Sequence, residues 1–92
     1  MATQLLSNQT TDGSSSDHTL ADSDRTLSVY GTFGGCSVDL KLKVETGVYT
    51  PFKVFKGATT VVLDIDVGCV IQLEVRGATS STSVSAVIGP VA

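Results

Sequence analysis

The sequence predicts an all-β protein: a small antiparallel β-sandwich or barrel of about six strands, preceded by an extended N-terminal arm. Residues 36–45 alternate between apolar and polar side chains five times in succession, which is the period of a half-buried strand. Similar segments recur at roughly ten-residue spacing between glycine-containing turns. No window shows the roughly 3.6-residue period of an amphipathic helix.

Three segments alternate clearly and three more weakly. The apolar set of 36–45 is followed by those of 60–67 and 69–76; together they comprise Cys36, Val38, Leu40, Leu42, Val44, Val61, Leu63, Ile65, Val67, Cys69, Ile71, Leu73 and Val75. The weaker strands are 26–32, 48–55 and 81–88. Pro51 predicts that the strand 48–55 lies at a sheet edge or contains a bulge, because proline donates no backbone hydrogen bond. We expect Phe33 and Phe52 to add to the core.

The charge divides the chain into two segments. Residues 1–24, called the arm below, contain four aspartates and no lysine or arginine, whereas residues 25–92 contain six basic and five acidic residues. We therefore separate an acidic arm (1–24) from a β-sandwich body (25–92). The arm has only three leucines after Met1, too few to offset the entropy of ordering it. We expect it to be disordered alone and to be ordered by another chain.

The overall composition argues against several classes of partner. A formal net charge of −3 and a pI near 4.7 disfavour nucleic-acid binding, which depends on clustered lysine and arginine. No apolar run approaches the roughly 18–20 residues of a membrane-spanning helix, and the first residues do not form an ordinary signal peptide. We expect neither a nucleic-acid nor a membrane partner.

The sequence also offers little for catalysis. We interpret Cys36 and Cys69 as free buried thiols in a reducing compartment, with an inter-strand disulfide as the alternative. The single histidine, His18, lies in the arm, so we expect no nucleophile–base pair and no zinc site. The prediction is a protein that is not an enzyme and that uses no cofactor or metal.

Two local motifs have structural interpretations. Asp64 and Asp66 are spaced to share the solvent face of a strand, where charges prevent incorrect edge pairing, and Lys41 and Lys43 are their expected cross-strand partners. Calcium binding is the alternative for this pair. The glycine-rich segment 31–35 precedes no helix, so we interpret it as a turn between strands.

Two segments carry a resemblance to a known group of proteins. Residues 28–40, SVYGTFGGCSVDL, and 70–88, VIQLEVRGATSSTSVSAVI, resemble small β-rich virion proteins of tailed bacteriophages. The similarity covers most of residues 26–88, and the chain departs from it at Glu45-Thr46-Gly47, where relatives often carry an Asp-Gly-Gly turn. The resemblance implies a virion structural protein assembled in the host cytoplasm: a capsid decoration or cement protein, or alternatively a tail or head–tail component. Such proteins commonly form trimers or other small oligomers.

This resemblance leads to an expectation about the arm. We expect the arm, together with the body, to bridge neighbouring capsid subunits by binding the major capsid protein or other virion proteins. Its candidate contact residues are three apolar anchors and four carboxylates: Leu5, Leu6, Leu20, Asp12, Asp17, Asp22 and Asp24. A different class, a ligand- or carbohydrate-binding adhesion module, remains open, with aromatic candidates Tyr30, Tyr49 and Phe55.

Overall fold

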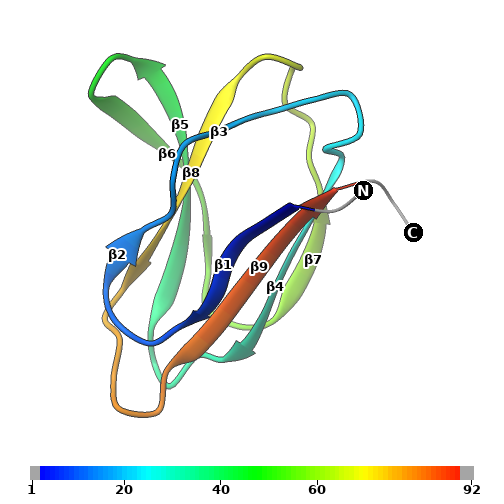
Figure 1. The fold of residues 1–92 in the computed structure, drawn as a ribbon. Helices are drawn as coiled ribbons and strands as arrows, with labels where there is room; N and C mark the ends of the chain where they lie inside the picture. Colours follow the sequence, from blue (N-terminus) through cyan, green and yellow to red (C-terminus); the bar gives the residue numbers. More distant parts are fainter. Residues whose placement is uncertain (1–2, 90–92) are drawn as a thin grey trace.

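Two antiparallel sheets pack face to face in the computed structural model, which describes residues 3–89 (Figure 1). Within this range there are nine strands and no helix: β1 (Thr3–Gln9), β2 (Gly13–Ser14), β3 (His18–Thr19), β4 (Thr26–Thr32), β5 (Ser37–Glu45), β6 (Val48–Phe55), β7 (Thr59–Val62), β8 (Val70–Arg76) and β9 (Ser83–Gly89). The all-β sandwich prediction is thereby confirmed.

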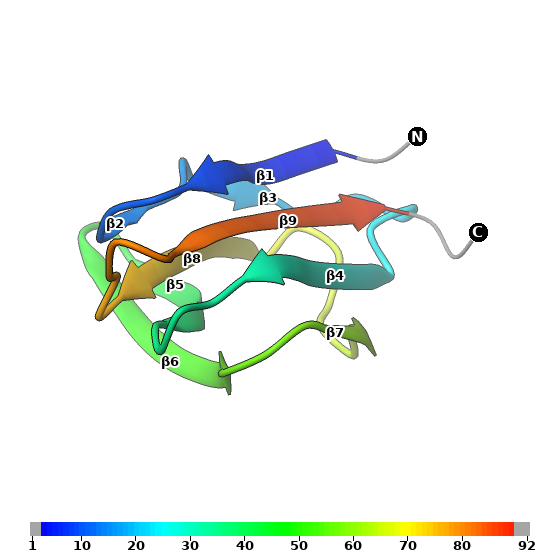
Figure 2. The same cartoon turned by 90° about the horizontal axis from the view of Figure 1, so that it is seen from below.

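The strand order places the two ends of the described chain in one sheet. Sheet A has the order β1-β9-β4-β7, and sheet B has the order β2-β8-β5-β6, with β3 also pairing with β8. Figure 2 shows the two layers, with β1, β2 and β3 along one side and the β6–β7 connection along the opposite side. The sandwich thus has one side closed by the arm and one side where β6 and β7 are edge strands.

The alternating pattern of β5 and β8 forms the centre of the core. Val38 pairs with Val75 and Leu40 with Leu73, and all four side chains are completely buried. A shift of one residue would turn these apolar side chains to solvent, so burial specifies the register. Leu27 and Val29 of β4 face them from sheet A and are equally buried.

The β6 strand has the edge position and the irregularity that Pro51 predicts. It pairs only with β5 in sheet B, and the register shifts between the partners of Leu40 and Lys41, where Pro51 pairs with Lys41. Two core expectations are wrong here, because Phe52 and Val44 are exposed. Phe52 lies at this first register shift. Val44 lies at a second register shift, between Lys43 and Glu45 at the end of β5, so neither side chain keeps the inward alternation.

The strand expected at 60–67 ends at Val62, which pairs with Thr26 at the beginning of β4. Beyond this point sheet A offers no further β4 residue to pair with. The chain continues as a loop in which Leu63 N–H donates to the Arg25 carbonyl at 2.8 Å. Leu63 and Ile65 remain buried, but Val67 is exposed, so its assignment to the apolar set is wrong, because the loop does not keep the alternation of a strand. Asp64 and Asp66 therefore lie on an exposed loop rather than on a strand face.

The arm is part of the sandwich, which differs from the expectation of a segment ordered by another chain. Its β1 pairs with β9, and β2 and β3 pair with successive parts of β8. Leu6 and Leu20 are only 4% and 2% exposed and belong to the core. The number of apolar residues in the arm underestimated its tendency to be ordered by its own chain. The open edges of β8 and β9 supply backbone hydrogen bonds, which a count of apolar residues does not include.

We predict that truncating either buried arm leucine destabilises the whole domain. Leu6→Ala and Leu20→Ala should each lower the free energy of unfolding by about 2–4 kcal/mol, because each removes a buried side chain and leaves a cavity. Urea unfolding monitored by circular dichroism measures this loss. The exposed Ser7→Ala variant is the control and should stay within about 0.5 kcal/mol of wild type; equal stability of all three variants would contradict the integrated arm.

Candidate interaction surfaces

The two cysteines are free, and the single histidine contacts an aspartate. Cys36 is buried, Cys69 is half-buried, and both are free thiols. The His18 ring instead contacts Asp24, with 2.9 Å between Nε2 and Oδ2. Among residues 3–89, no group of three or more His, Cys, Asp and Glu side chains is placed to hold a metal ion.

The His18–Asp24 contact closes a turn within the arm. Asp24 is buried and also accepts a hydrogen bond from the Ala21 N–H at 2.8 Å. Burial alone would raise the pKa of Asp24, but the Ala21 hydrogen bond and the His18 contact outweigh it and lower this pKa below its ordinary value. The pair therefore fixes the approach of the arm to β4, and we assign it a structural role.

Asp17 fastens the arm to the outer surface of sheet B. Its carboxylate accepts hydrogen bonds from Tyr49 Oη at 2.7 Å, Lys43 Nζ at 3.0 Å and Gln72 Nε2 at 3.3 Å, donors that come from three different strands. The Tyr49 and Lys43 hydrogen bonds lower the pKa of Asp17, and they raise the pKa values of Tyr49 and Lys43. The sequence did not indicate this cluster, because its members are distant along the chain.

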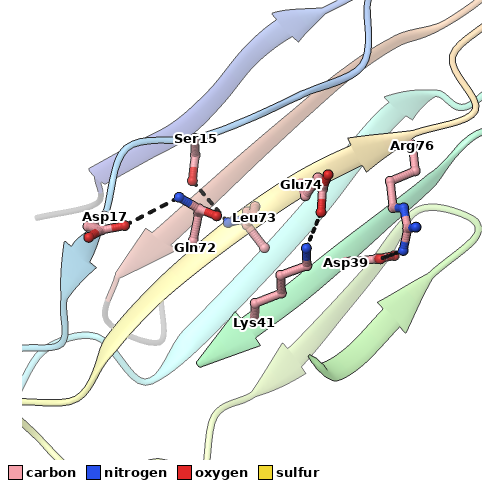
Figure 3. Close-up of polar contacts among 8 residues, drawn as sticks. All are labelled: Ser15, Asp17, Asp39, Lys41, Gln72, Leu73, Glu74 and Arg76. Atoms are coloured by element: carbon pink, nitrogen blue, oxygen red, sulfur yellow. Dashed lines mark hydrogen bonds and ion pairs between the residues drawn. The ribbon is translucent and has the colours of Figure 1, made fainter. Parts of the chain in front are cut away.

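Further charges on this surface are also paired with each other. Arg76 donates to Asp39 at 3.0 Å, and Lys41 donates to Glu74 (Figure 3). Lys41 and Lys43 were expected to pair with Asp64 and Asp66, but their partners are Glu74 and Asp17. Figure 3 shows the Arg76–Asp39 and Lys41–Glu74 pairs along one face of β5 and β8. Most charged side chains on β5 and β8 are therefore paired within the chain.

The seven predicted partner-binding residues of the arm mostly contact their own chain. Leu6 and Leu20 are in the core and Leu5 packs against it. Asp12 accepts a hydrogen bond from the Ala78 N–H at 2.7 Å; Asp17 and Asp24 have the partners described above. Asp22 is exposed, and its backbone carbonyl accepts a hydrogen bond from Arg25. The groups expected to bind a partner thus hold the arm to the body instead.

Sheet A presents a surface of a different kind. None of the residues in β1, β4, β7 and β9 is charged. Since Leu27 and Val29 face the core, the intervening side chains point outward, and the register aligns Ser28 with Thr60 on one side and Val87 on the other. We call this outer surface the uncharged face; it is formed by Thr26, Ser28, Tyr30, Thr32, Thr60, Val62, Ser83 and Val87.

The uncharged face combines hydroxyl groups with two exposed larger side chains. Tyr30 is 45% exposed and Val62 is 75% exposed, while Ser28 Oγ and Thr60 Oγ1 form a hydrogen bond of 3.0 Å across β4 and β7. Depletion of charge with an exposed tyrosine is typical of the central part of protein interfaces. The sequence analysis did not predict this face. The signal that could have indicated it is that the outward positions of 26–32 are polar and uncharged.

Comparisons of the chain with protein-family models, with curated proteins and with solved structures found no match. Within the described part of the chain, no helix is long and apolar enough to cross a membrane. The interpretation of the surfaces therefore depends on their own geometry and chemistry.

We predict that the folded protein loses, in acid, the stability that the arm contacts contribute. Because the folded-state pKa values of Asp17 and Asp24 lie below the ordinary value of 3.8, their contribution is fully present above that value and is lost as the pH falls through the folded-state pKa. Urea unfolding at pH 7, 5, 3 and 2 should show the steepest loss below about pH 4.

The matched variants are Asp17→Asn and Asp22→Asn. The first should lower stability at pH 7 and show a shallower decline in acid, because it removes one of the titrating contacts. The second changes an exposed carboxylate and should follow the wild-type curve. Identical curves for wild type and Asp17→Asn would show that the Asp17 cluster does not fasten the arm.

Proposed function

We propose that this protein is a structural subunit of a tailed-bacteriophage particle, a capsid decoration or cement protein that binds the shell through the uncharged face of sheet A. The observation that carries the proposal is the difference between the two outer surfaces. Sheet B carries seven lysine, arginine, aspartate and glutamate residues on β5, β6 and β8, five of which form ion pairs, whereas the strands of sheet A have no charged residue. The resemblance of residues 26–88 to virion proteins supports the particle as the setting.

The physical chemistry of the uncharged face suits docking onto another protein surface. Serine and threonine side chains lose little conformational entropy when they are buried, and no charged group has to be removed from water. Tyr30 and Val62 provide exposed apolar area, and Tyr30 adds a hydroxyl group that can hydrogen-bond with a partner. Many copies on a shell would add further stability through multivalency, even where each contact is weak.

In this proposal the body alone has the bridging role first expected of the body and the arm together. The arm is folded against β8 and β9, so the sandwich binds as a unit. Its partners are the major capsid protein or other virion proteins, and it acts in the virion as a small oligomer. A tail or head–tail location would use the same surface and is distinguished by where in the particle the protein is found.

A carbohydrate-binding adhesion module is the second candidate function. Tyr30 favours it, because an exposed aromatic ring among hydroxyl groups is a suitable platform for a sugar. Tyr49 and Phe55 do not contribute, since Tyr49 is hydrogen-bonded to Asp17 and Phe55 is buried. Binding of the purified protein on a glycan array, with loss of binding in Tyr30→Ala, would favour this function over the virion role.

The virion proposal is tested by finding the protein in purified particles and by rebinding it to particles that lack it. The Tyr30→Ala/Val62→Lys variant should bind at least about tenfold more weakly, as expected for loss of central interface residues. Thr46→Lys, an exposed position in the β5–β6 turn, is the control and should bind like wild type. Absence from particles, or unchanged occupancy of the face variant, would contradict the proposal.

A further inference from the structure

The side of the sandwich opposite the arm has two free strand edges. In sheet B the last strand is β6, and in sheet A it is β7; residues 56–58 connect the two strands. Figure 2 shows this connection on the side away from β1 and β3. Unpaired strand edges can add a strand from another chain, so we searched this side for signs of what it would accept.

Exposed apolar side chains are concentrated on these two strands. Seven large apolar side chains are exposed in the described residues, and four of them lie on β6 or β7: Val48, Phe52, Val54 and Val62. A hollow lies between the two edges and is lined by residues that include Phe55, Val61 and Lys53. The open side thus offers apolar surface beside a recess for a side chain.

The charged residues of β6, β7 and the connection between them are both lysines. Residues 46–63 contain Lys53 and Lys56 and no acidic residue, and both lysines line the hollow. Within residues 3–89, these two lysines form no ion pair, whereas Lys41, Lys43 and Arg76 each pair with a carboxylate. The remaining basic residue, Arg25, donates to the backbone carbonyls of Asp22 and Ile65.

We propose that this open side binds an extended acidic segment of a partner protein. The segment adds along Phe52–Phe55, places an apolar side chain in the hollow against Phe55 and Val61, and directs its carboxylates toward Lys53 and Lys56. Pro51 limits the contact to this part of β6, because proline lacks the N–H group that a longer ladder would require. This open side borders the uncharged face and shares Val62 with it. The proposed site is formed by Phe52–Phe55, Lys56 and Val61, so the proposal does not depend on the function above.

A second copy of the chain fits this edge less well. Antiparallel pairing of two β6 strands around a two-fold axis would bring the lysines of both copies to one narrow site, and like charges on neighbouring strands are destabilising. An acidic segment would neutralise the same lysines. The charge distribution therefore favours a different chain of opposite charge, and self-association through β6 becomes an outcome of the test.

The test uses a fluorescein-labelled heptapeptide in which valine alternates with aspartate or glutamate, and the same peptide with lysine at the acidic positions. Fluorescence anisotropy at low ionic strength should show saturable binding of the acidic peptide, at least tenfold tighter than that of the basic peptide. Amide chemical-shift changes on binding should be confined to residues 52–62. Equal binding of both peptides, or shifts centred on β1, β4 or β9, would overturn the proposal.

Two double variants separate a local site from a general charge effect. Lys53→Gln/Lys56→Gln should weaken binding at least tenfold, while Thr10→Asp/Ser80→Asp gives the same change in net charge at exposed positions elsewhere and should change binding less than twofold. Equal weakening by both variants would overturn the proposal. So would a wild-type dimer, detected by native mass spectrometry, that Val54→Lys converts to a monomer.

Discussion

The pairing of the arm with the edges of β8 and β9 is the contact on which the rest of the structure depends. Without it, the β8 and β9 edges would be open as well as the β6 and β7 edges, and the core would lose Leu6 and Leu20. The arm pairs with one sheet, crosses the side of the sandwich and pairs with the other. It therefore links the two layers through backbone hydrogen bonds as well as through side-chain packing.

Once the arm occupies one side, the remaining surfaces acquire distinct properties. Sheet B is covered by ion pairs, one of which involves Asp17 of the arm itself. Sheet A has an uncharged outer face, and the opposite side has two free edges with unpaired lysines. Because Lys41, Lys43 and Arg76 each pair with a carboxylate, the lysines without an ion pair in the described residues are Lys53 and Lys56. The surfaces therefore differ in chemistry.

Local patterns predicted much of the body but not the arm. The strands 26–32 and 48–55 coincide with β4 and β6, and Pro51 indicated the edge position correctly. The β7 strand was predicted too long, because alternation continues to Val67 although the partner strand begins at Thr26. The arm strands have almost no periodicity of their own, and they form because distant strands offer them free edges. For the same reason, the donors around Asp17 could not be identified from the sequence.

The register of β1 on β9 has a consequence for the order in which the chain can fold. Thr3 pairs with Ile88, so one of the first described residues pairs with one of the last described residues, which is synthesised much later. Contacts between residues so distant in sequence form slowly, because a long loop must close before they contribute. During translation β1 therefore has no partner strand until β9 has left the ribosome. The pairing of β1 with β9 joins the two ends of the described chain, and a chain interrupted before β9 would leave Leu6 without its partner Ala86.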